Sequence, residues 1–541
     1  MMRTNLHDSC GTVRDWMQPH GDLNEGMVRP GRWWLAASAL AVVLAVPFFT
    51  IDVPPVLDYP NHLARYFVLA HPSDPILSQM YEPRWAILPN LGMDVLGALL
   101  LRVTDAHVGG RMLLALSLFA PVIGVIAYSR AAFGRFTYWP LASGLAAYNG
   151  VFIMGFMNFL LSLGLAFMAA AGWIVWRRQG NTALAVIVGA LLSAVIFLCH
   201  IFGVVLFAML IGAFELARLD TERRSGTLRV SDVIGTAILG AVTLAPALVL
   251  YLMSPLSDGA PLGPWGGLHK LWDLLTPFLL YSKQLTLVTA VAFFSALVLA
   301  WRHLRFAPGI VLVLTVLGAI FVITPSAIKG GTFVDNRVAL MIGLVLFAGV
   351  QLQLPSRTAT TIGVILAALI GLRSGYVASV WVSHRESIAE LRSAIAKVEP
   401  GKRVLVARGY PIEPPPGVPA AWVLPGIGWL QSHMPALLVI ERRAFWPLLF
   451  ADASQQPLVV KPPYDRSAHP LSDLVHWSML DKAPDPDVVR VLARYLPDWR
   501  TKFDDVLLLA PTDKLQPIGG LMPIHESPFA ALYRVEQPRA R

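Results

Sequence analysis

Charge and cysteine are both scarce in this chain of 541 residues. Charged residues make up 14% of the sequence, whereas a soluble protein carries about 25%. There are two cysteines, Cys10 near the start and Cys199 at the end of an apolar run. This pair predicts neither a disulfide nor a cysteine-held metal site. The low charge argues against an ordinary soluble protein and makes the apolar segments the main signal.

Several familiar motifs are also missing. Residues 383–541, whose composition is that of a soluble domain, have no Gly-rich phosphate loop, no nucleophile elbow and no metal-type spacing. No internal repeat or low-complexity tract is visible. The net charge is +9, but no basic patch alternates with aromatic residues. We therefore expect no nucleic-acid partner.

Hydrophobic residues are abundant: they make up 55% of the chain, and the mean hydropathy is +0.59. Apolar runs fall near residues 33–50, 111–129, 137–153, 157–176, 182–199, 201–217, 232–252, 285–301, 308–325, 337–354 and 359–381. A transmembrane helix needs roughly 20 such residues. The pattern predicts a polytopic α-helical membrane protein with about eleven spans.

The charged residues are concentrated in the last third of the chain. Residues 1–382 hold 24 Lys+Arg and 17 Asp+Glu, and residues 383–541 hold 19 and 17 in far fewer positions. This divides the chain into a polar tail (1–32), a membrane domain (33–382) and a C-terminal domain of soluble composition (383–541). In the long loop 51–110, the apolar run 91–103 is too short to cross, so we expect short interfacial helices there.

Orientation follows from the basic residues, which crowd into the tail and into the short loops after every second span. They are Arg3, Arg14, Arg29, Arg32, Arg130, Arg135, Arg177, Arg178, Arg218, Arg223, Arg224, Arg229, Arg302, Arg305 and Arg357. The positive-inside rule makes that side cytoplasmic. The loop 51–110 and the C-terminal domain are then expected outside, in the periplasm if the plasma membrane is bacterial. The first span is expected to stay uncleaved.

The C-terminal domain alternates short β-type stretches with helical patterns and Pro-rich loops. The β-type stretches are 403–407, 437–440, 505–509 and 531–535. We expect a small α/β domain of about 150 residues, which is a usual domain size.

One segment of the outer loop is dense in chemically active groups. It reads Asp58-Tyr59-Pro60-Asn61-His62-Leu63-Ala64-Arg65. Pro60 suits the first turn of a helix, so Asp58 would lie at the N-terminus. An N-cap is the commoner role of an Asp in that position. The alternative is a general base at the mouth of the membrane domain.

Further polar residues are expected on the same outer side. His200 lies at a turn between two spans, Lys329, Asp335 and Arg337 lie in one loop, and Arg373 lies inside the last span. Polar groups within apolar spans mark cavities or functional sites by default. The simpler readings are an interfacial anchor for His200, snorkelling for Lys329 and Arg337, and an Asp335–Arg337 ion pair.

The architecture and the segment 58–65 together resemble the GT-C superfamily of integral-membrane glycosyltransferases, in particular a broad bacterial branch of it. The resemblance covers residues 33–382 in layout and about ten residues in motif. Many members have paired acidic residues in the first outer loop, whereas Tyr59 follows Asp58 here. The resemblance therefore implies a role for Asp58 without implying an acceptor class or a metal.

The resemblance implies a transfer of sugar from a polyprenyl-phosphate donor to an envelope acceptor (a glycolipid, a polysaccharide or a protein). Asp58 would be the base, and His62 would orient it or bind a phosphate oxygen. The leaving phosphate needs polar and cationic partners. The candidates are Arg65, His200, Lys329, Asp335, Arg337 and Arg373. A divalent cation held by Asp58, His62 and Asp335 stays an alternative.

Two other classes of function compete with an enzyme. A glycolipid transporter or flippase would show repeats and broken helices at the bilayer midplane, but the polar residues here gather at one face. A membrane scaffold whose outer domain binds a partner agrees with the lack of a catalytic motif in residues 383–541. Such a scaffold would tolerate Asp58→Asn, and an enzyme would not.

Overall fold

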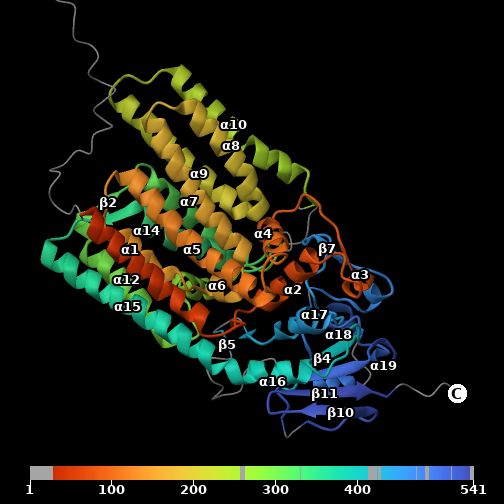
Figure 1. Ribbon diagram of the computed structural model, residues 1–541. Helices are drawn as coiled ribbons and strands as arrows, with labels where there is room; N and C mark the ends of the chain where they lie inside the picture. Colours follow the sequence, from red (N-terminus) through yellow and green to blue (C-terminus); the bar gives the residue numbers. More distant parts are fainter. Residues whose placement is uncertain are drawn as a thin grey trace, which may run out of the picture.

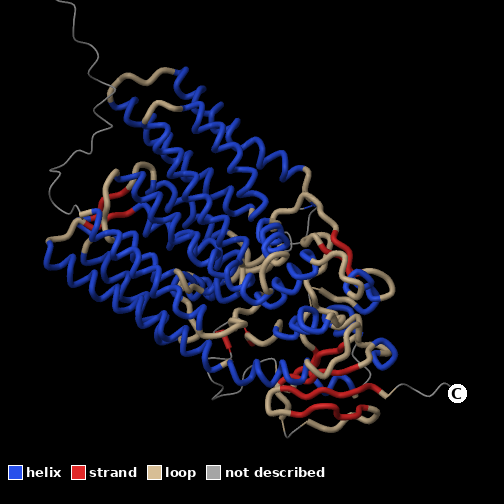
Figure 2. Tube along the Cα trace, in the orientation of Figure 1, coloured by secondary structure: helices blue, strands red, loops and turns tan. Residues whose placement is uncertain are grey.

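The structure, a computed structural model, describes residues 29–255, 262–328, 331–411, 423–424, 428–470, 472–481, 486–512 and 515–536. A bundle of long helices forms one end of the molecule, and a small sheet with short helices forms the other (Figures 1 and 2). Short helices of the loop 51–110 lie between the two. The chain is therefore a helical bundle followed by a small α/β unit.

Seven helices in the described part of the chain are long and apolar enough to cross a membrane, or up to eight if one bent pair is a single span. They are α1 (Pro30–Ala45) with η2 (Val46–Phe49), α5 (Ala106–Phe133), α7 (Met157–Arg178), α8 (Thr182–Cys199), α9 (Ile201–Arg224), α10 (Val230–Leu252), and α15 (Ser356–Ser383) with α16 (Arg385–Ile395). The bent pair joins Gly267–Phe278 to Lys283–Leu299 at 82°. These are the helices of a multi-pass membrane protein.

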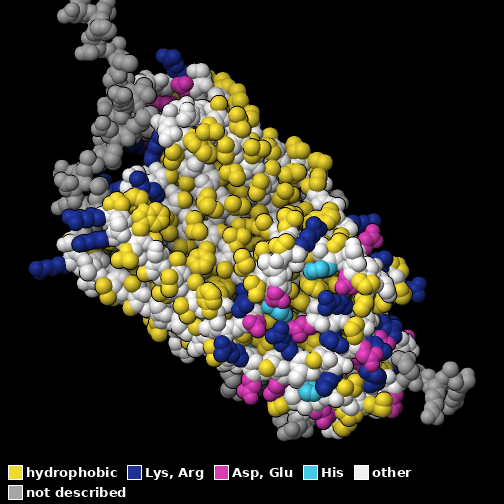
Figure 3. Space-filling view, viewed as in Figure 1, with side chains coloured by type: hydrophobic (Ala, Val, Ile, Leu, Met, Phe, Trp, Pro, Cys, Tyr) yellow, Lys and Arg dark blue, Asp and Glu magenta, His cyan; other side chains and the backbone are white. Residues whose placement is uncertain are grey.

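The outer faces of this bundle are apolar. Large side chains such as Ile187 and Leu191 of α8, and Ile238 and Val249 of α10, are more than half exposed. Figure 3 shows hydrophobic side chains covering the bundle, with Lys and Arg at its far end and charges of both signs over the C-terminal unit. A helix that is hydrophobic all round is stable only in an apolar environment. The exposed faces therefore fit a lipid bilayer.

The expected count of about eleven regular spans is not reproduced. The apolar run 137–153 is the 3-10 helix η3 (Trp139–Ala146) followed by the short helix α6 (Gly150–Met154). Asn149 separates them, because its side chain accepts a hydrogen bond from Phe152 N and starts a new helix. Three further helices are shorter than the roughly 20 residues of a span. They are α12 (Lys283–Leu299), α13 (Ile310–Ile323) and α14 (Val334–Gly349).

Although η3–α6 is irregular, this segment and the residues just before it reach from the N-terminal end of α1 to the loop 51–110. Its start lies beside the N-terminal end of α1, where Trp33 Nε1 donates to Thr137 O at 2.9 Å. Its end lies beside the loop 51–110, where Asp58 N donates to Met154 O at 3.1 Å. A total of eleven membrane spans, some of them irregular, therefore stays a prediction.

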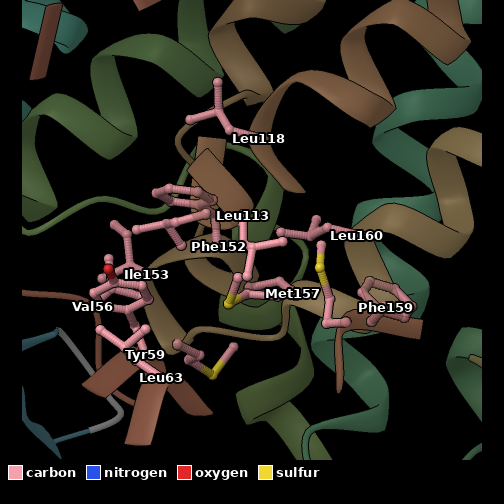
Figure 4. Packing of buried hydrophobic residues seen from close by; sticks show 14 of the residues in the cluster. Val56, Tyr59, Leu63, Leu113, Leu118, Phe152, Ile153, Met157, Phe159 and Leu160 are labelled. Carbon is pink, nitrogen blue, oxygen red and sulfur yellow. The ribbon is translucent and has the colours of Figure 1, made fainter. Parts of the chain in front are cut away.

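The loop 51–110 forms the short helices that its composition predicts. They are α2 (Tyr59–Ala70), α3 (Leu77–Met80) and α4 (Gly92–Leu100), with the strand β1 (Tyr81–Pro83) between α3 and α4. Tyr59 and Leu63 of α2 pack into the core against Val56, Leu113 and Ile153 (Figure 4). This packing seats the N-terminus of α2 on the bundle.

The C-terminal unit contains a mixed five-stranded sheet in the order β10-β11-β9-β4-β8. The strands are β4 (Val404–Arg408), β8 (Val475–His476), β9 (Asp505–Leu509), β10 (Leu521–Glu526) and β11 (Ala530–Val535). Three of the expected strands are confirmed as β4, β9 and β11. The fourth, 437–440, is wrong, because this run belongs to the helix α17 (Leu437–Arg442). A short apolar run cannot distinguish a strand from a buried helix.

The C-terminal unit is joined to the loop 51–110 by backbone pairing, a charge pair and a side-chain hydrogen bond. β1 pairs antiparallel with β7 (Leu458–Val460), with Glu82 opposite Val459. Arg443 Nε lies 3.5 Å from Asp74 Oδ2, and Lys461 Nζ donates to Ser78 O at 2.9 Å. One continuous hydrophobic core runs through both parts. Residues of the loop 51–110 and residues of the C-terminal unit therefore lie side by side, although they are far apart in the sequence.

Candidate functional site

Asp58 lies just before the first turn of α2, with its backbone tied to the neighbouring segment. Its N–H donates to Met154 O, and its C=O accepts from His62 N at 2.9 Å. Gly155 makes this approach possible: it has φ +90°, and a Cβ built there would lie 3.0 Å from Asp58 Cβ. Only glycine adopts that conformation without strain and leaves the space open.

The Asp58 side chain does not cap the helix, although an N-cap was the commoner expectation. No side-chain cap hydrogen bond forms at this helix start, and Asp58 already has helical backbone angles (φ −83°, ψ −11°). A capping residue has extended angles that turn its side chain back toward the first N–H groups. Pro60 removes one of those N–H groups altogether. The carboxylate is left available for another partner.

That partner is His433, which comes from the C-terminal unit. Its Nε2 lies 3.4 Å from Asp58 Oδ1, and the two side chains are 15% and 17% exposed. Asn61, on the first turn of α2, holds the other ring nitrogen, with its Nδ2 2.9 Å from His433 Nδ1. The segment 58–61 and the C-terminal unit therefore build one site together.

Burial dominates the electrostatics of this site. It raises the pKa of the Asp58 carboxyl from 3.8 to about 7, although the charges of Arg65 and Arg337 act to lower it. Burial, with the charges of Arg65 and His433, holds the pKa of His62 well below its ordinary value. Burial also lowers the pKa of His433 to about 4. Near neutral pH the site therefore contains two neutral imidazoles and one carboxyl group that titrates.

His62 lies on the same helix, packed among aromatic rings. Its ring is stacked with that of Tyr66 at 6.1 Å and lies edge-on to Phe450 at 5.2 Å, measured between centroids. Its Nδ1 is buried and has no hydrogen-bond partner within the described ranges. No contact joins His62 to the Asp58 carboxylate in this part of the chain. Its predicted catalytic role stays a prediction.

Arg65 is fully buried and bound to a carboxylate that we did not predict. Its Nε lies 2.6 Å from Asp94 Oδ1, and its Nη2 lies 3.1 Å from Oδ2. Asp94 comes from α4, so this two-point contact fixes α4 against α2. The remaining nitrogen, Nη1, is buried without a partner among the described residues. Arg65 therefore keeps one free donor edge.

Arg337 and His200 form a second polar pair. Arg337 Nη1 lies 2.8 Å from His200 Nε2, and Phe202 N lies 3.2 Å from Nδ1 of the same ring. The Arg337 guanidinium lies over the ring of Phe156 at 4.6 Å, and its Nε is buried without a partner in the described part of the chain. The aromatic contact favours the cation without supplying a hydrogen-bond acceptor.

This pair has more donors than acceptors. A neutral imidazole has one acceptor nitrogen, because the other carries the proton. Both ring nitrogens of His200 face an N–H group, one from Arg337 and one from Phe202. Arg337 also makes no ion pair with a carboxylate of the described residues. An anion with several acceptor oxygens would satisfy the surplus donors.

The other predicted residues lie in different surroundings. Asp335 is buried and pairs with Lys270, whose Nζ also donates to Phe321 O at 2.8 Å and Thr324 O at 2.6 Å. The Asp335–Arg337 pair that we considered does not form. Arg373 donates to Tyr148 O at 2.8 Å and Phe278 O at 2.9 Å, so it holds backbone together. Lys329 lies outside the described residues.

The alternative metal site is not assembled. In the ranges that the structure describes, no group of three His, Cys, Asp or Glu residues could hold a metal ion. Asp335, one of the three expected ligands, is neutralised by Lys270. The residues present offer Asp58 one imidazole neighbour, and this is too few donors for a protein-bound divalent cation.

Sequence reasoning missed the residues whose roles depend on long-range contacts. His433 stands alone in a C-terminal segment without a motif, so no sequence signal marks it. Asp94 had a signal, because it is a single acid within the apolar run 91–103. Asn61 was part of the segment 58–65, but its partners Leu448 and Phe450 could not be foreseen.

Comparison with known proteins adds one finding. No model of a protein family matches this chain, and no curated protein matches it. A similarity is found to the crystal structure of ArnT from Cupriavidus metallidurans bound to undecaprenyl phosphate. It covers 94% of this chain and 98% of that chain, with 12% sequence identity and a TM-score of 0.49. At this identity and score the family of the chain stays open, and the site must be interpreted from its own geometry.

Proposed function

We propose that this chain is a membrane glycosyltransferase that moves a sugar from a polyprenyl phosphate to an acceptor of the cell envelope. One observation carries the proposal: Asp58, at one end of the apolar bundle, has a pKa raised to about 7 beside a neutral His433. A general base is most effective when its pKa lies near the working pH. Burial gives Asp58 that property.

The reaction would proceed by direct displacement. A hydroxyl or amine of the acceptor attacks the anomeric carbon, and its proton passes to a carboxylate oxygen of Asp58. The bond between the anomeric carbon and the phosphate oxygen breaks, and both of its electrons leave with the polyprenyl phosphate. Charge therefore develops on the phosphate as the proton reaches Asp58, and each change needs its own protein group.

Arg337 and His200 are the groups that we assign to the phosphate. Their surplus of N–H donors matches the several acceptor oxygens of a phosphate. The charge of Arg337 acts on Asp58, so the two groups belong to one electrostatic site. Arg65, with one free donor edge and Asp94 behind it, is a second candidate for the same ligand.

We place the site on the outer side of the plasma membrane. The N-terminus would then be cytoplasmic, eleven apolar segments would cross, and residues 383–541 would be periplasmic. The basic residues of the opposite end support this orientation through the positive-inside rule (Figure 3). The polyprenyl chain of the donor would lie in the bilayer, with its phosphate at the level of α2.

The test is sugar transfer by purified protein reconstituted in lipid. A panel of labelled polyprenyl-phosphate pentoses and hexoses would be offered with envelope material from a strain that lacks the wild-type protein. Asp58→Asn should lower turnover by about 10²–10⁴-fold and leave donor binding largely intact. Asp52→Asn is the matched control, because Asp52 lies on the same loop with its side chain 62% exposed.

Two results would contradict the proposal. Normal transfer by a well-folded Asp58→Asn protein would exclude this residue as the base and favour the scaffold. Movement of intact donor across the membrane, without release of polyprenyl phosphate, would identify a transporter.

A further inference from the structure

His433 reaches Asp58 from the far end of the sequence and is held there firmly. It lies 372 residues after Asn61, the residue that contacts its Nδ1. Its ring lies 5.1 Å from that of Phe450 and 6.3 Å from that of Trp446, between centroids. Contacts on its faces and at Nδ1 leave Nε2 directed at the carboxylate of Asp58.

The Asn61 side chain determines which nitrogen of His433 carries the proton. Asn61 Oδ1 accepts from Phe450 N at 2.7 Å, and Asn61 Nδ2 donates to Leu448 O at 2.8 Å. These two backbone partners fix the orientation of the amide, because a reversed amide would place N–H against N–H and O against O. Nδ2 therefore also donates to His433 Nδ1.

A neutral histidine whose Nδ1 accepts must carry its proton on Nε2. The Nε2–H group then points at Asp58 Oδ1 over 3.4 Å. Such distances are common before a substrate binds and shorten in the complex. Protonating Nδ1 would break its bond with Asn61, and burial already lowers the pKa of His433 to about 4.

We propose that His433 is a positioning residue for Asp58: its Nε2–H holds Oδ1, so Oδ2 is the oxygen that faces the acceptor. The proposal deepens the assignment of Asp58 as the base and rests on it. In the transfer step the acceptor proton goes to Oδ2, and the His433 proton stays on Nε2. The C-terminal unit is then a part of the site, because it supplies this histidine.

Other charged groups also affect the pKa of Asp58, and they stay the same in every variant that is compared. Arg65 comes from its own helix, Arg337 comes from α14, and both lower its pKa. His62 stays neutral near pH 7. Removing the Nε2–H donor while these groups remain should destabilise the carboxylate form of Asp58. Its pKa should rise.

The experiment measures the titration of Asp58 in the full-length protein without depending on turnover. Carbodiimide labelling of Asp58, quantified by mass spectrometry across pH, follows the protonated carboxyl. Three variants are compared with wild type. His433→Leu removes the donor, His433→Gln keeps an N–H donor, and His525→Leu removes a half-buried histidine whose Nε2 contacts Ser393.

We expect the labelling midpoint to rise by about one pH unit in His433→Leu, since a hydrogen bond to a charged group is worth roughly that much. His433→Gln should lie between this variant and wild type, and His525→Leu should match wild type. Transfer by His433→Leu at pH 7 should fall about fivefold, because the deprotonated fraction of Asp58 drops from about one half to about one tenth, and it should recover toward pH 8.5. A purely structural role would not move the midpoint.

An unchanged midpoint in folded His433→Leu protein would overturn the positioning role. If Asp58→Asn abolishes transfer while His433→Leu leaves both the midpoint and the pH profile unchanged, the proposed function stands and this inference fails. If the midpoint moves as expected but no donor yields transfer, the contact between His433 and Asp58 stands and the proposed function fails.

Discussion

Burial and two arginines act on the Asp58 carboxyl in opposite directions, and burial is the larger effect. Ionising the Asp58 carboxyl therefore costs free energy in the folded protein, and the pKa of this group lies near neutral pH. Raising a carboxyl pKa from 3.8 to about 7 corresponds to up to about 4 kcal/mol at 1.36 kcal/mol for each pKa unit. Such strain is typical of a functional group and unusual for a helix cap.

Asp58→Asn should therefore stabilise the fold above neutral pH. The folded wild type keeps the Asp58 proton up to about pH 7, whereas the unfolded chain loses it near pH 4. Stability is thus highest below the unfolded pKa and falls as the pH rises through the folded one. Asn does not titrate, so thermal melts in detergent should show a higher Tm for Asp58→Asn at pH 8 and no difference at pH 4. If wild type and Asp58→Asn had the same Tm at pH 8 as well as at pH 4, the raised pKa of Asp58 would be contradicted.

Arg337 and Arg373 should separate binding from stability. Arg337→Ala removes a cation whose Nε–H group has no partner among the described residues. Binding of the polyprenyl-phosphate sugar should weaken by about 10–100-fold, as expected for the loss of a charge-assisted hydrogen bond. Arg373→Ala should leave two buried carbonyl groups unpaired, at roughly 1–3 kcal/mol each. Its donor affinity should match wild type while its Tm falls. If both variants lost the same affinity for the polyprenyl-phosphate sugar, Arg373 would also have a role in binding it.

At the scale of elements, the turn after α6 matters most for the site. Gly155 has φ +90°, and a methyl group there would lie within 3.1 Å of the Asp58 and Tyr59 nitrogens. Gly134, at the end of α5, also has a positive φ of +71° but has open space around it. Both glycines have a positive φ, and Gly155 alone of the two is surrounded by other atoms.

Gly155→Ala should displace Asp58 and lower transfer strongly. Gly134→Ala should cost stability of about 1 kcal/mol through its backbone strain and leave transfer unchanged. Sugar transfer and apparent Tm, measured for both variants, test this difference. Wild-type turnover in folded Gly155→Ala protein would show that Asp58 tolerates a shift at this contact.

Which elements could be predicted depended on how much of their structure is local. The start of α2 follows from Pro60, and the strands β9 and β11 fall on short apolar stretches that contain valine or tyrosine. The run 137–153 is not one α-helix, because it begins as the 3-10 helix η3 and Asn149 starts a new helix near its end. The run 437–440 failed as a strand because four apolar residues have no period to read.

At the scale of the whole molecule, the C-terminal unit is fixed to the loop 51–110 by the β1–β7 pairing. Cysteines at Glu82 and Val459, which lie directly opposite each other, should form a disulfide on mild oxidation in a background without Cys10 and Cys199. Cross-strand neighbours are close enough for this bond. A gel shift after protease cleavage between the two positions would detect it. Absence of a cross-link under complete oxidation would contradict the closed arrangement.

The same scale explains why only half of the site could be predicted. His62 and Arg65 lie on α2 and Asp58 directly precedes it, so their grouping is visible in eight consecutive residues. His200 and Arg337 were expected on one side of the membrane, and the structure brings them together at 2.8 Å. Asp94 joins the site through its ion pair with Arg65, and its only signal in the sequence is that it is an acid in an apolar run. His433 joins through contacts between distant segments, and such contacts leave no pattern in a single sequence.

The central claim is that Asp58 accepts the acceptor proton, and the pH dependence of kcat/KM for sugar transfer tests it most directly. Wild-type protein should show an acid limb with a midpoint near pH 7, since the base works only when deprotonated. Asp58→Asn should show a low rate, and that limb should be absent. The account would be contradicted if Asp58→Asn kept the wild-type limb with the same midpoint.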